Sequence, residues 1–206
     1  MKIFLVGSAC WMLASFIGTA SAQVADPSEN EAARRVAVGT CAVCHGPRGN
    51  SDTPKFPKLA GQREGYLAGQ LKAFRDQTRG DADAIAYMWG MAGPLSDGMI
   101  AALARYYASQ TAAPGRPANT ALVAQGREIY IKGVASENIP ACGTCHGGRA
   151  EGAGDFPRLA GQHAEYLIKQ LYSFRNESRN VAVMHGVAKE MKLPEMQAVA
   201  AYLESQ

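Results

Sequence analysis

The sequence has little net charge, no strand-like alternation and only one long hydrophobic run, and the first two of these shortages each exclude a class of protein. It carries 21 Lys and Arg residues against 18 Asp and Glu residues, and the basic residues are scattered rather than clustered. No nucleic-acid-binding surface is predicted, because such a surface needs concentrated positive charge. No segment alternates convincingly between polar and apolar residues, so no β-sheet is predicted either.

The one hydrophobic run lies at the start of the chain. Lys2 precedes an apolar segment from Ile3 to Ile17, and an A-x-A site ends at Ala22. A basic start, a short apolar core and a small-residue cleavage site are typical of a secretory signal peptide, here residues 1–22. The competing interpretation is an uncleaved anchor, although the run is short for a membrane span and no second apolar stretch follows it.

Cysteine is also scarce, and its positions form a pattern. Of the five cysteines, Cys10 would leave with the signal peptide. The other four form two C-x-x-C-H motifs, Cys41-Ala-Val-Cys44-His45 and Cys142-Gly-Thr-Cys145-His146. This motif is the attachment sequence of c-type haem: the cysteines form thioethers with the vinyl groups, and the histidine becomes an axial ligand of the iron. Two covalently bound haem c groups are therefore predicted.

Other interpretations of the cysteines explain less. A single zinc site would leave both motif histidines without a role and would join pairs about a hundred residues apart. Disulfides or a thioredoxin-like redox pair are not favoured, because no βαβ pattern surrounds either motif. Covalent haem attachment also agrees with export, since in bacteria it takes place outside the cytoplasm. The predicted location is the periplasm.

An internal repeat divides the chain. The segment Phe56-Pro-Lys-Leu-Ala-Gly-Gln62 returns as Phe156-Pro-Arg-Leu-Ala-Gly-Gln162. Between residues 56–79 and 156–179, 13 of 24 positions are identical. A segment with two prolines and a glycine separates the copies and is typical of a linker. We expect domain 1 at residues 23–110, the linker at 111–118 and domain 2 at 119–206.

Each half is predicted to be all α-helical. First helices are expected at 29–38 and 119–132, the latter with Asn119 or Thr120 as N-cap. After each haem motif, apolar residues and glutamines recur with helical spacing from Tyr66 to Phe74 and again 100 residues later. The last helices are expected at 99–109 and 194–204. A domain of this size has only a modest core, so the haem-free chain is expected to fold poorly.

An electron-carrying haem iron needs a second axial ligand, and methionine is the candidate. Aligning the halves matches Met88-Trp-Gly with Met184-His-Gly, just before the last helix of each half. We predict Met88 and Met184 as the distal ligands; His185 is the rival in the second half. The remaining methionines of these segments are predicted to fill the core: Met91, Met99, Met191 and Met196. His163, which replaces Arg63 of the first copy, is expected on the surface.

These motifs together resemble the dihaem cytochrome c4 family. The resemblance covers essentially the whole mature chain and includes the repeated F-P-[KR]-L-A-G-Q block. It implies two tandem class I cytochrome c domains with haem propionates near the domain interface. The thioether sites would be Cys41, Cys44, Cys142 and Cys145, the proximal ligands His45 and His146, and the distal ligands Met88 and Met184. Pro57 and Pro157 would accept a hydrogen bond from the proximal histidine.

The resemblance implies a periplasmic electron carrier rather than an enzyme. Its partners would be redox proteins, namely a terminal oxidase, a quinol-oxidising complex or a dehydrogenase, sometimes with a loose association with the membrane. The alternative is a dihaem subunit of a larger oxidoreductase, such as a flavoprotein sulfide dehydrogenase. A dihaem peroxidase or thiosulfate-oxidising enzyme is less favoured, because no spare cysteine remains as a ligand once Cys10 is removed. The predicted segment before Met184 is also shorter than that before Met88.

Overall fold

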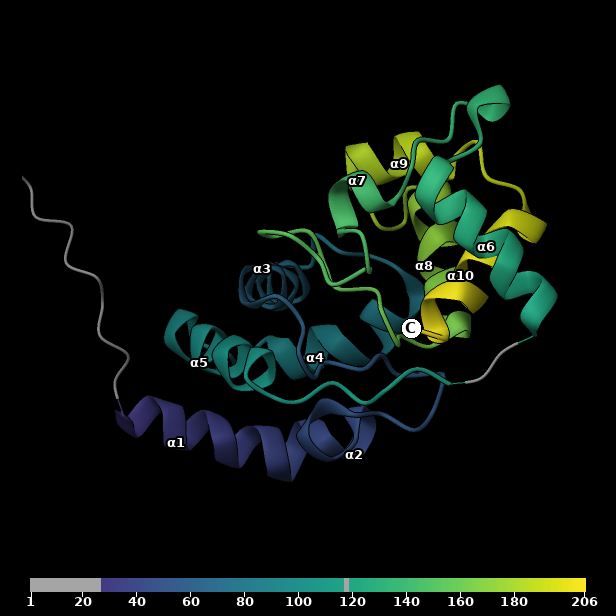
Figure 1. The fold of residues 1–206 in the computed structure, drawn as a ribbon. Helices are drawn as coiled ribbons and strands as arrows, with labels where there is room; N and C mark the ends of the chain where they lie inside the picture. Colours follow the sequence, from purple (N-terminus) through teal and green to yellow (C-terminus); the bar gives the residue numbers. More distant parts are fainter. Residues whose placement is uncertain (1–26, 117–118) are drawn as a thin grey trace, which may run out of the picture.

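The computed structural model describes residues 27–116 and 119–206, and the predicted signal peptide lies outside them. Within these two ranges the chain forms helices and loops, with no β-strand and two isolated bridges, Val134–Ile139 and Ala153–Phe156. The predicted all-α fold class with two tandem halves is confirmed by this architecture (Figure 1).

The helices follow a similar order in both halves, and the first half has additional short elements. In the first half these are α1 (Pro27–Val36), the π-helical η1 (Ala37–Cys41), α2 (Ala42–His45), the 3₁₀ turn η2 (Pro47–Gly49), α3 (Glu64–Arg75), the π-helical η3 (Ala84–Met88), α4 (Trp89–Ala92) and α5 (Asp97–Ala108). In the second half they are α6 (Thr120–Lys132), the 3₁₀ turn η4 (Ala135–Glu137), α7 (Gly143–His146), α8 (Ala164–Arg175), α9 (Ala182–Ala188) and α10 (Leu193–Glu204).

Side-chain caps fix where several helices begin. The Ser96 hydroxyl accepts a hydrogen bond from the Met99 amide at 3.1 Å, so α5 starts two residues before the predicted position. The Asn119 side chain accepts from the amides of Ala121 and Leu122, which confirms it as the N-cap of α6. These caps satisfy amides that have no partner within the helix.

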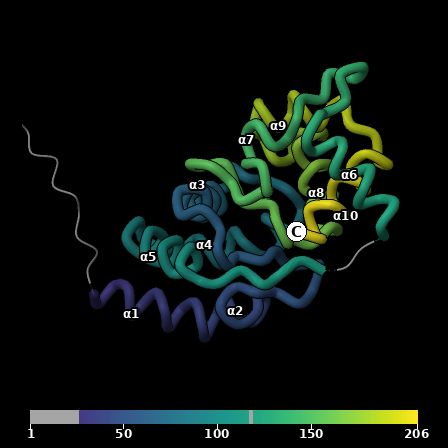
Figure 2. Tube along the Cα trace, in the orientation of Figure 1, coloured from purple at the N-terminus to yellow at the C-terminus, as the bar shows by residue number. Residues whose placement is uncertain are grey.

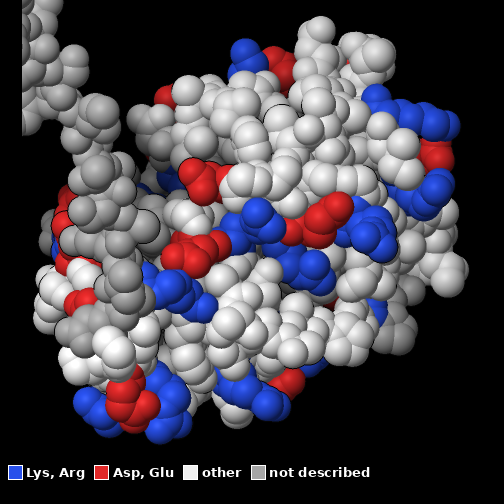
Figure 3. All heavy atoms as spheres, turned by 60° about the vertical axis from the view of Figure 1, so that its left-hand side comes forward, with Lys and Arg blue, Asp and Glu red and all other residues white. Residues whose placement is uncertain are grey.

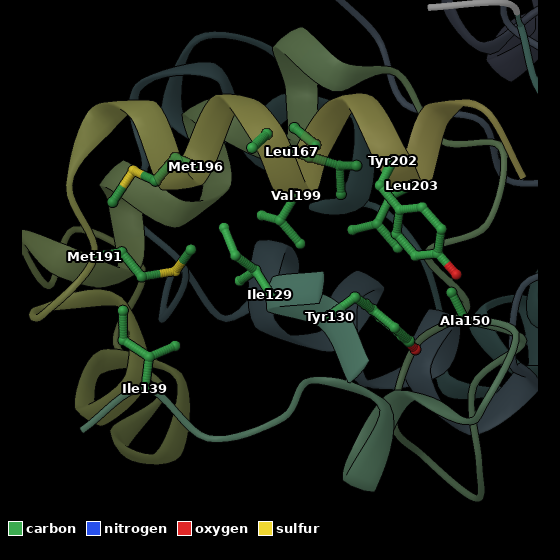
Figure 4. Packing of buried hydrophobic residues seen from close by; sticks show 12 residues of the cluster. Ile129, Tyr130, Ile139, Ala150, Leu167, Met191, Met196, Val199, Tyr202 and Leu203 are labelled. Atoms are coloured by element: carbon green, nitrogen blue, oxygen red, sulfur yellow. The ribbon is translucent and has the colours of Figure 1, made fainter. Parts of the chain in front are cut away.

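The second half has a single hydrophobic core between α6, α8 and α10 (Figure 4). Twelve buried residues form it, including Ile129 and Tyr130 on α6 and Val199 and Tyr202 on α10. The two helices approach closely at Gly126, where an added Cβ would lie 1.9 Å from the Ala198 carbonyl oxygen. Only glycine permits this contact, so α10 packs directly against the backbone of α6.

The first-half core is smaller and divided. Seven buried residues, among them Ala33, Leu103 and Tyr107, join α1, α3 and α5. Three others form a separate cluster around Phe74, against which Met88 packs. The space between the helices of this half is taken up by a cavity, described below.

The halves meet through loops and through polar side chains of α3 and α8. The loop after α7 extends toward α3 of the first half (Figure 2), where Arg63 Nε donates to the Gly154 carbonyl at 3.1 Å. His163 also lies in this interface, and the prediction of a surface position for it was wrong. Its side chain is 0% exposed, with Nε2 2.9 Å from the Ser51 carbonyl oxygen of the first half. A loop contact across the domains has no periodic pattern that would have revealed it.

Candidate haem-binding sites

The two C-x-x-C-H motifs adopt nearly the same local structure. Cys41 ends the π-helical turn η1 and is followed directly by α2, whereas Cys142 caps α7. The His146 amide donates to the Cys142 carbonyl at 3.0 Å, so the two residues are one helical turn apart. Gly46 then ends α2 with φ of 73°, where an added Cβ would lie 2.4 Å from the Asn50 carbonyl oxygen. The four motif cysteines are all half-buried and form no disulfide.

Both motif histidines are oriented by a proline carbonyl. His45 Nδ1 donates to the Pro57 carbonyl at 2.9 Å, and His146 Nδ1 donates to that of Pro157 at 3.0 Å. This hydrogen bond assigns the proton to Nδ1 and leaves the Nε2 lone pair for a metal ion. Burial lowers the pKa of both histidines, only partly offset by the proline hydrogen bond, so each ring is held neutral. The proline contact predicted from the resemblance is therefore present in both halves.

A cavity of about 380 Å³ lies in the first half against His45. The residues that line it include both motif cysteines, Cys41 and Cys44, together with His45 and Met88. Met88 comes from η3, on a different helix from the motif, so the fold brings the predicted proximal and distal residues to one cavity. The cavity is also lined by Arg158 and Tyr166 of the second half, so it reaches the domain interface.

The other methionines sort into two groups. Met191 and Met196 are 2% and 0% exposed within the second-half core, and Met99 packs at the edge of the first-half core, which confirms these three as packing residues. Met91 was predicted to fill the core, and that prediction was wrong. It is 46% exposed and lines the first-half cavity beside Met88, because both lie on consecutive turns of the same helical segment.

In the second half, Met184 and His185 stand side by side on α9. Both are half-buried. His185 Nδ1 donates to the Phe174 carbonyl at 3.0 Å, and Nε2 lies 3.9 Å from a carboxylate oxygen of Glu177. Both ring nitrogens of His185 therefore face α8 and the turn after it.

The chain segment between the motif histidine and Met184 is shorter than that before Met88, and the structure shows why. His45 and Met88 are separated by 43 positions, but His146 and Met184 by only 38. The first half reaches its methionine through the π-helical η3 and continues into α4. The second half has only the regular α9, of seven residues. The extra residues of the first half thus form an additional wide helical turn before the methionine.

A set of polar side chains across the interface was missed by sequence reasoning. Arg79 Nη2 donates to Gln170 Oε1 at 2.8 Å, and Arg179 Nη2 donates to Gln70 Oε1 at 2.7 Å and to the Tyr66 hydroxyl at 2.8 Å. The two arginines are 7% and 5% exposed. The sequence did contain a signal, because the same tyrosine, glutamine and arginine recur at matched positions of both copies. Polar residues that recur in this way indicate a shared contact rather than an unconstrained surface.

Orphaned donors at this interface fit the acidic edge of a haem. Arg158 Nε and Arg179 Nε are buried and have no hydrogen-bond partner in the parts of the chain that the structure describes. A buried unpaired donor is costly, and each haem carries two carboxylates that would accept such hydrogen bonds. Together with the thiols, the oriented histidine and the cavity of the first half, these donors show that the residues present fit haem c.

Comparisons with known proteins agree with this geometry. The family model described as Cytochrome c matches residues 31–111 and again 123–206. Cytochrome c4 of Thiocapsa roseopersicina is 39% identical over 191 residues, which are 90% of this chain and 95% of that one. A thiosulfate dehydrogenase electron acceptor of Thiomonas intermedia (strain K12) is 40% identical over 82% of this chain and 79% of that one.

Solved structures give the same result. The crystal structure of reduced recombinant cytochrome c4 from Pseudomonas stutzeri matches with a TM-score of 0.77 and 36% identity, over 88% of this chain and 99% of that one. The match spans both halves, so it covers their relative placement as well as each domain. The predicted cofactor, two covalently bound haem c groups, and the predicted electron-transfer role are confirmed by this membership. The chain belongs to the dihaem cytochrome c4 family of electron-transfer proteins.

Proposed function

We propose that the chain is a periplasmic electron carrier in which both haem irons have a histidine and a methionine as axial ligands. The ligand pairs are His45 with Met88 and His146 with Met184. The observation that carries this proposal is the first-half cavity, which is lined by both motif cysteines, the oriented histidine and Met88. The repeat extends the assignment to the second half, where His185 is already engaged with Phe174.

The residues of the chain provide attachment, orientation and closure of the iron sites. Each haem, when bound, takes up and releases one electron at its iron. The cysteines would hold the haem edge, and the proline carbonyls orient the histidine rings with Nε2 left free to bind the iron. Met88 and Met184 would supply the second ligand of each iron, which would leave neither iron open to peroxide or oxygen. A soft thioether ligand also favours the reduced state and raises the reduction potential.

The proposed domain limits and location follow from the same features. The domains are residues 23–110 and 119–206, with 111–118 between them, supported by a family match that restarts in the second half. Export to the periplasm is supported by the A-x-A site at Ala22. It is also supported by the haem groups, because in bacteria covalent haem attachment takes place outside the cytoplasm. Among the helices of 27–116 and 119–206, none is long and apolar enough to cross a membrane.

We further propose that a terminal oxidase accepts the electrons and that a quinol-oxidising complex or a dehydrogenase supplies them. A thiosulfate dehydrogenase is the favoured donor of the dehydrogenase class, because a relative 40% identical to this chain is described as its electron acceptor. This observation favours a separate acceptor protein over a tightly bound subunit of a flavoprotein sulfide dehydrogenase. The visible face of the surface carries interspersed charges of both signs (Figure 3), which suits a transient partner.

The ligand assignment is tested with haem-loaded protein from the periplasm. We expect two haems per chain by the pyridine haemochrome method and a methionine-to-iron charge-transfer band in the far red. Met88→Ala and Met184→Ala should each remove half of this band while the haem count stays at two. His185→Gln is the matched control and should leave the band intact. Retention of the full band in either methionine variant would refute that ligand.

The donor is tested by mixing the oxidised protein with purified thiosulfate dehydrogenase and thiosulfate. Rapid reduction of both haems is expected, followed by reoxidation when membranes that contain a terminal oxidase are added. Reduction only by a flavoprotein that co-purifies with the chain would instead support the subunit alternative.

A further inference from the structure

The two interface arginines occupy matched positions but differ in their acidic partners. Arg79 Nε lies 2.7 Å from Asp81 Oδ2, and the two side chains are only 8% and 5% exposed. Two residues after Arg179 the chain has Val181, which is 38% exposed. Arg179 Nε has no partner within the described ranges, as noted above. The first half therefore has a buried carboxylate that the second half lacks at this place.

Asp81 belongs to the wall of the first-half cavity. Its side chain lines the same cavity as His45 and Met88. The residue also directly precedes the helical segment that carries Met88, and its carbonyl accepts from the Ile85 amide at 3.0 Å. The carboxylate is thus fixed next to the space that the haem takes, and solvent does not reach it.

A fixed buried carboxylate has a predictable effect on a haem iron. Oxidation adds one positive charge to the iron, so a nearby negative charge stabilises the oxidised form more than the reduced form. The effect persists in a buried site because the low local dielectric and the absence of mobile ions weaken screening. Arg79 offsets part of it, but the Arg79–Asp81 pair has no net charge, whereas no carboxylate of the described chain forms an ion pair with Arg179.

We propose that Asp81 lowers the reduction potential of the first-domain haem and that Val181 leaves the second-domain haem without this effect. The inference rests on the proposed function, since it takes both irons to have histidine–methionine ligation. One carboxylate on one copy of the repeat then separates the reduction potentials of two sites that are otherwise built alike. A single electron would therefore reside mainly on the second-domain haem.

Asp83 is a second carboxylate on the same cavity wall and supplies an internal comparison. Its side chain is 35% exposed and lies 2.6 Å from Lys169 Nζ of the second half. Solvent and the lysine both screen its charge from the haem. Replacing Asp83 should therefore shift the first-domain potential less than replacing Asp81 does.

The test is a spectroelectrochemical titration of the haem-loaded protein. In Asp81→Asn the first-domain wave should move to higher potential while the second-domain wave stays nearly in place. In Val181→Asp the second-domain wave should move to lower potential, by less than the Asp81→Asn shift, because residue 181 is 38% exposed and solvent screens part of the new charge. Asp52→Asn removes the same charge from a side chain that is 95% exposed and should move neither wave. A Met88→His variant changes only the first-domain ligand and so identifies its wave.

Three results would overturn the proposal: an unmoved first-domain wave in Asp81→Asn, a shift to lower potential, or equal shifts of both waves. If Asp81→Asn does not fold, an unmoved second-domain wave in Val181→Asp overturns it instead. Absence of two reversible one-electron waves in the unsubstituted protein would be a failure of the proposed function. The two failures are therefore distinguishable.

Discussion

The two halves of the molecule are nearly identical around the motif histidine and differ around the methionine predicted as the distal ligand. The histidine–proline hydrogen bonds measure 2.9 and 3.0 Å, and both glutamines at the end of the repeated block bind the opposite half. The halves diverge in the helix that carries the methionine and in the acidic residue beside the interface arginine. Attachment and orientation of haem are thus common to both, whereas the surroundings of the distal side are individual.

The hydrophobic cores of the two halves also differ. The second half has one cluster of twelve buried residues, and the first has clusters of seven and three separated by the cavity. A haem that fills the cavity would join the two first-half clusters into one core. The first domain should therefore depend on its haem more than the second does.

Removing one haem at a time gives the largest expected effect on this comparison. Cys41→Ser with Cys44→Ser, and separately Cys142→Ser with Cys145→Ser, should each reduce the haem count from two to one. The first pair should also lose more helicity, because the divided core then lacks the group that joins it. Pyridine haemochrome and far-UV circular dichroism measure both quantities. Equal helicity loss in the two variants would show that the cores do not differ in this way.

The symmetric glutamine contacts predict an intermediate effect. Gln62 Nε2 donates to the Arg158 carbonyl at 2.8 Å while its Oε1 accepts from the Arg158 amide at 2.7 Å. Gln162 makes the reciprocal pair with Lys58, both at 2.9 Å. Either glutamine replaced by alanine leaves two backbone groups unsatisfied, which should reduce the free energy of unfolding by about 1–3 kcal/mol.

The double variant should separate the two domains into independent unfolding transitions. Scanning calorimetry and small-angle X-ray scattering of the haem-loaded protein follow unfolding and separation respectively. Gln125→Ala, which changes an exposed glutamine on α6, is the control and should behave as the unsubstituted protein. A single coincident transition in the double variant would mean that other contacts hold the domains together.

The smallest expected effect concerns His163, which has no counterpart in the first half. Burial lowers its pKa, and the nearby Lys58 and Arg116 lower it further, against the Ser51 carbonyl and Glu204, which raise it. The unfolded chain then binds a proton at a higher pH than the folded chain does. Stability should be full above the unfolded pKa of about 6.5 and fall as the pH drops below it.

His163→Gln should therefore show a smaller loss of Tm between pH 7.5 and pH 5 than the unsubstituted protein. The difference between the two proteins isolates His163, because every other titrating group is shared. Parallel pH profiles would place the acid sensitivity elsewhere.

The sequence sufficed for the features that repeat. The helical stripe from Tyr66 to Phe74 predicted α3 within two residues, and Asn119 predicted the start of α6. The motif spacing also predicts the attachment sites. These signals are local, because caps and hydrophobic periodicity depend on residues within a few turns of each other. Aligning the halves likewise separated Met88 and Met184 from the buried Met191 and Met196.

Long-range contacts were the part that could not be predicted. His163 was expected on the surface and is fully buried, because its partners Ser51 and Glu204 come from distant segments. Met91 was expected in the core and instead lines the cavity. The crossed glutamine contacts also depend on how two loops meet, which no periodicity encodes. The repeat marked the glutamines and arginines but not their partners.

The most direct test of the account is to expose the fully reduced, haem-loaded protein to carbon monoxide while recording its visible spectrum. Two irons closed by histidine and methionine should give no spectral change, and the protein should still exchange two electrons reversibly. Binding of carbon monoxide at either iron would mean an open or displaceable site and would contradict the assignment of a closed electron carrier.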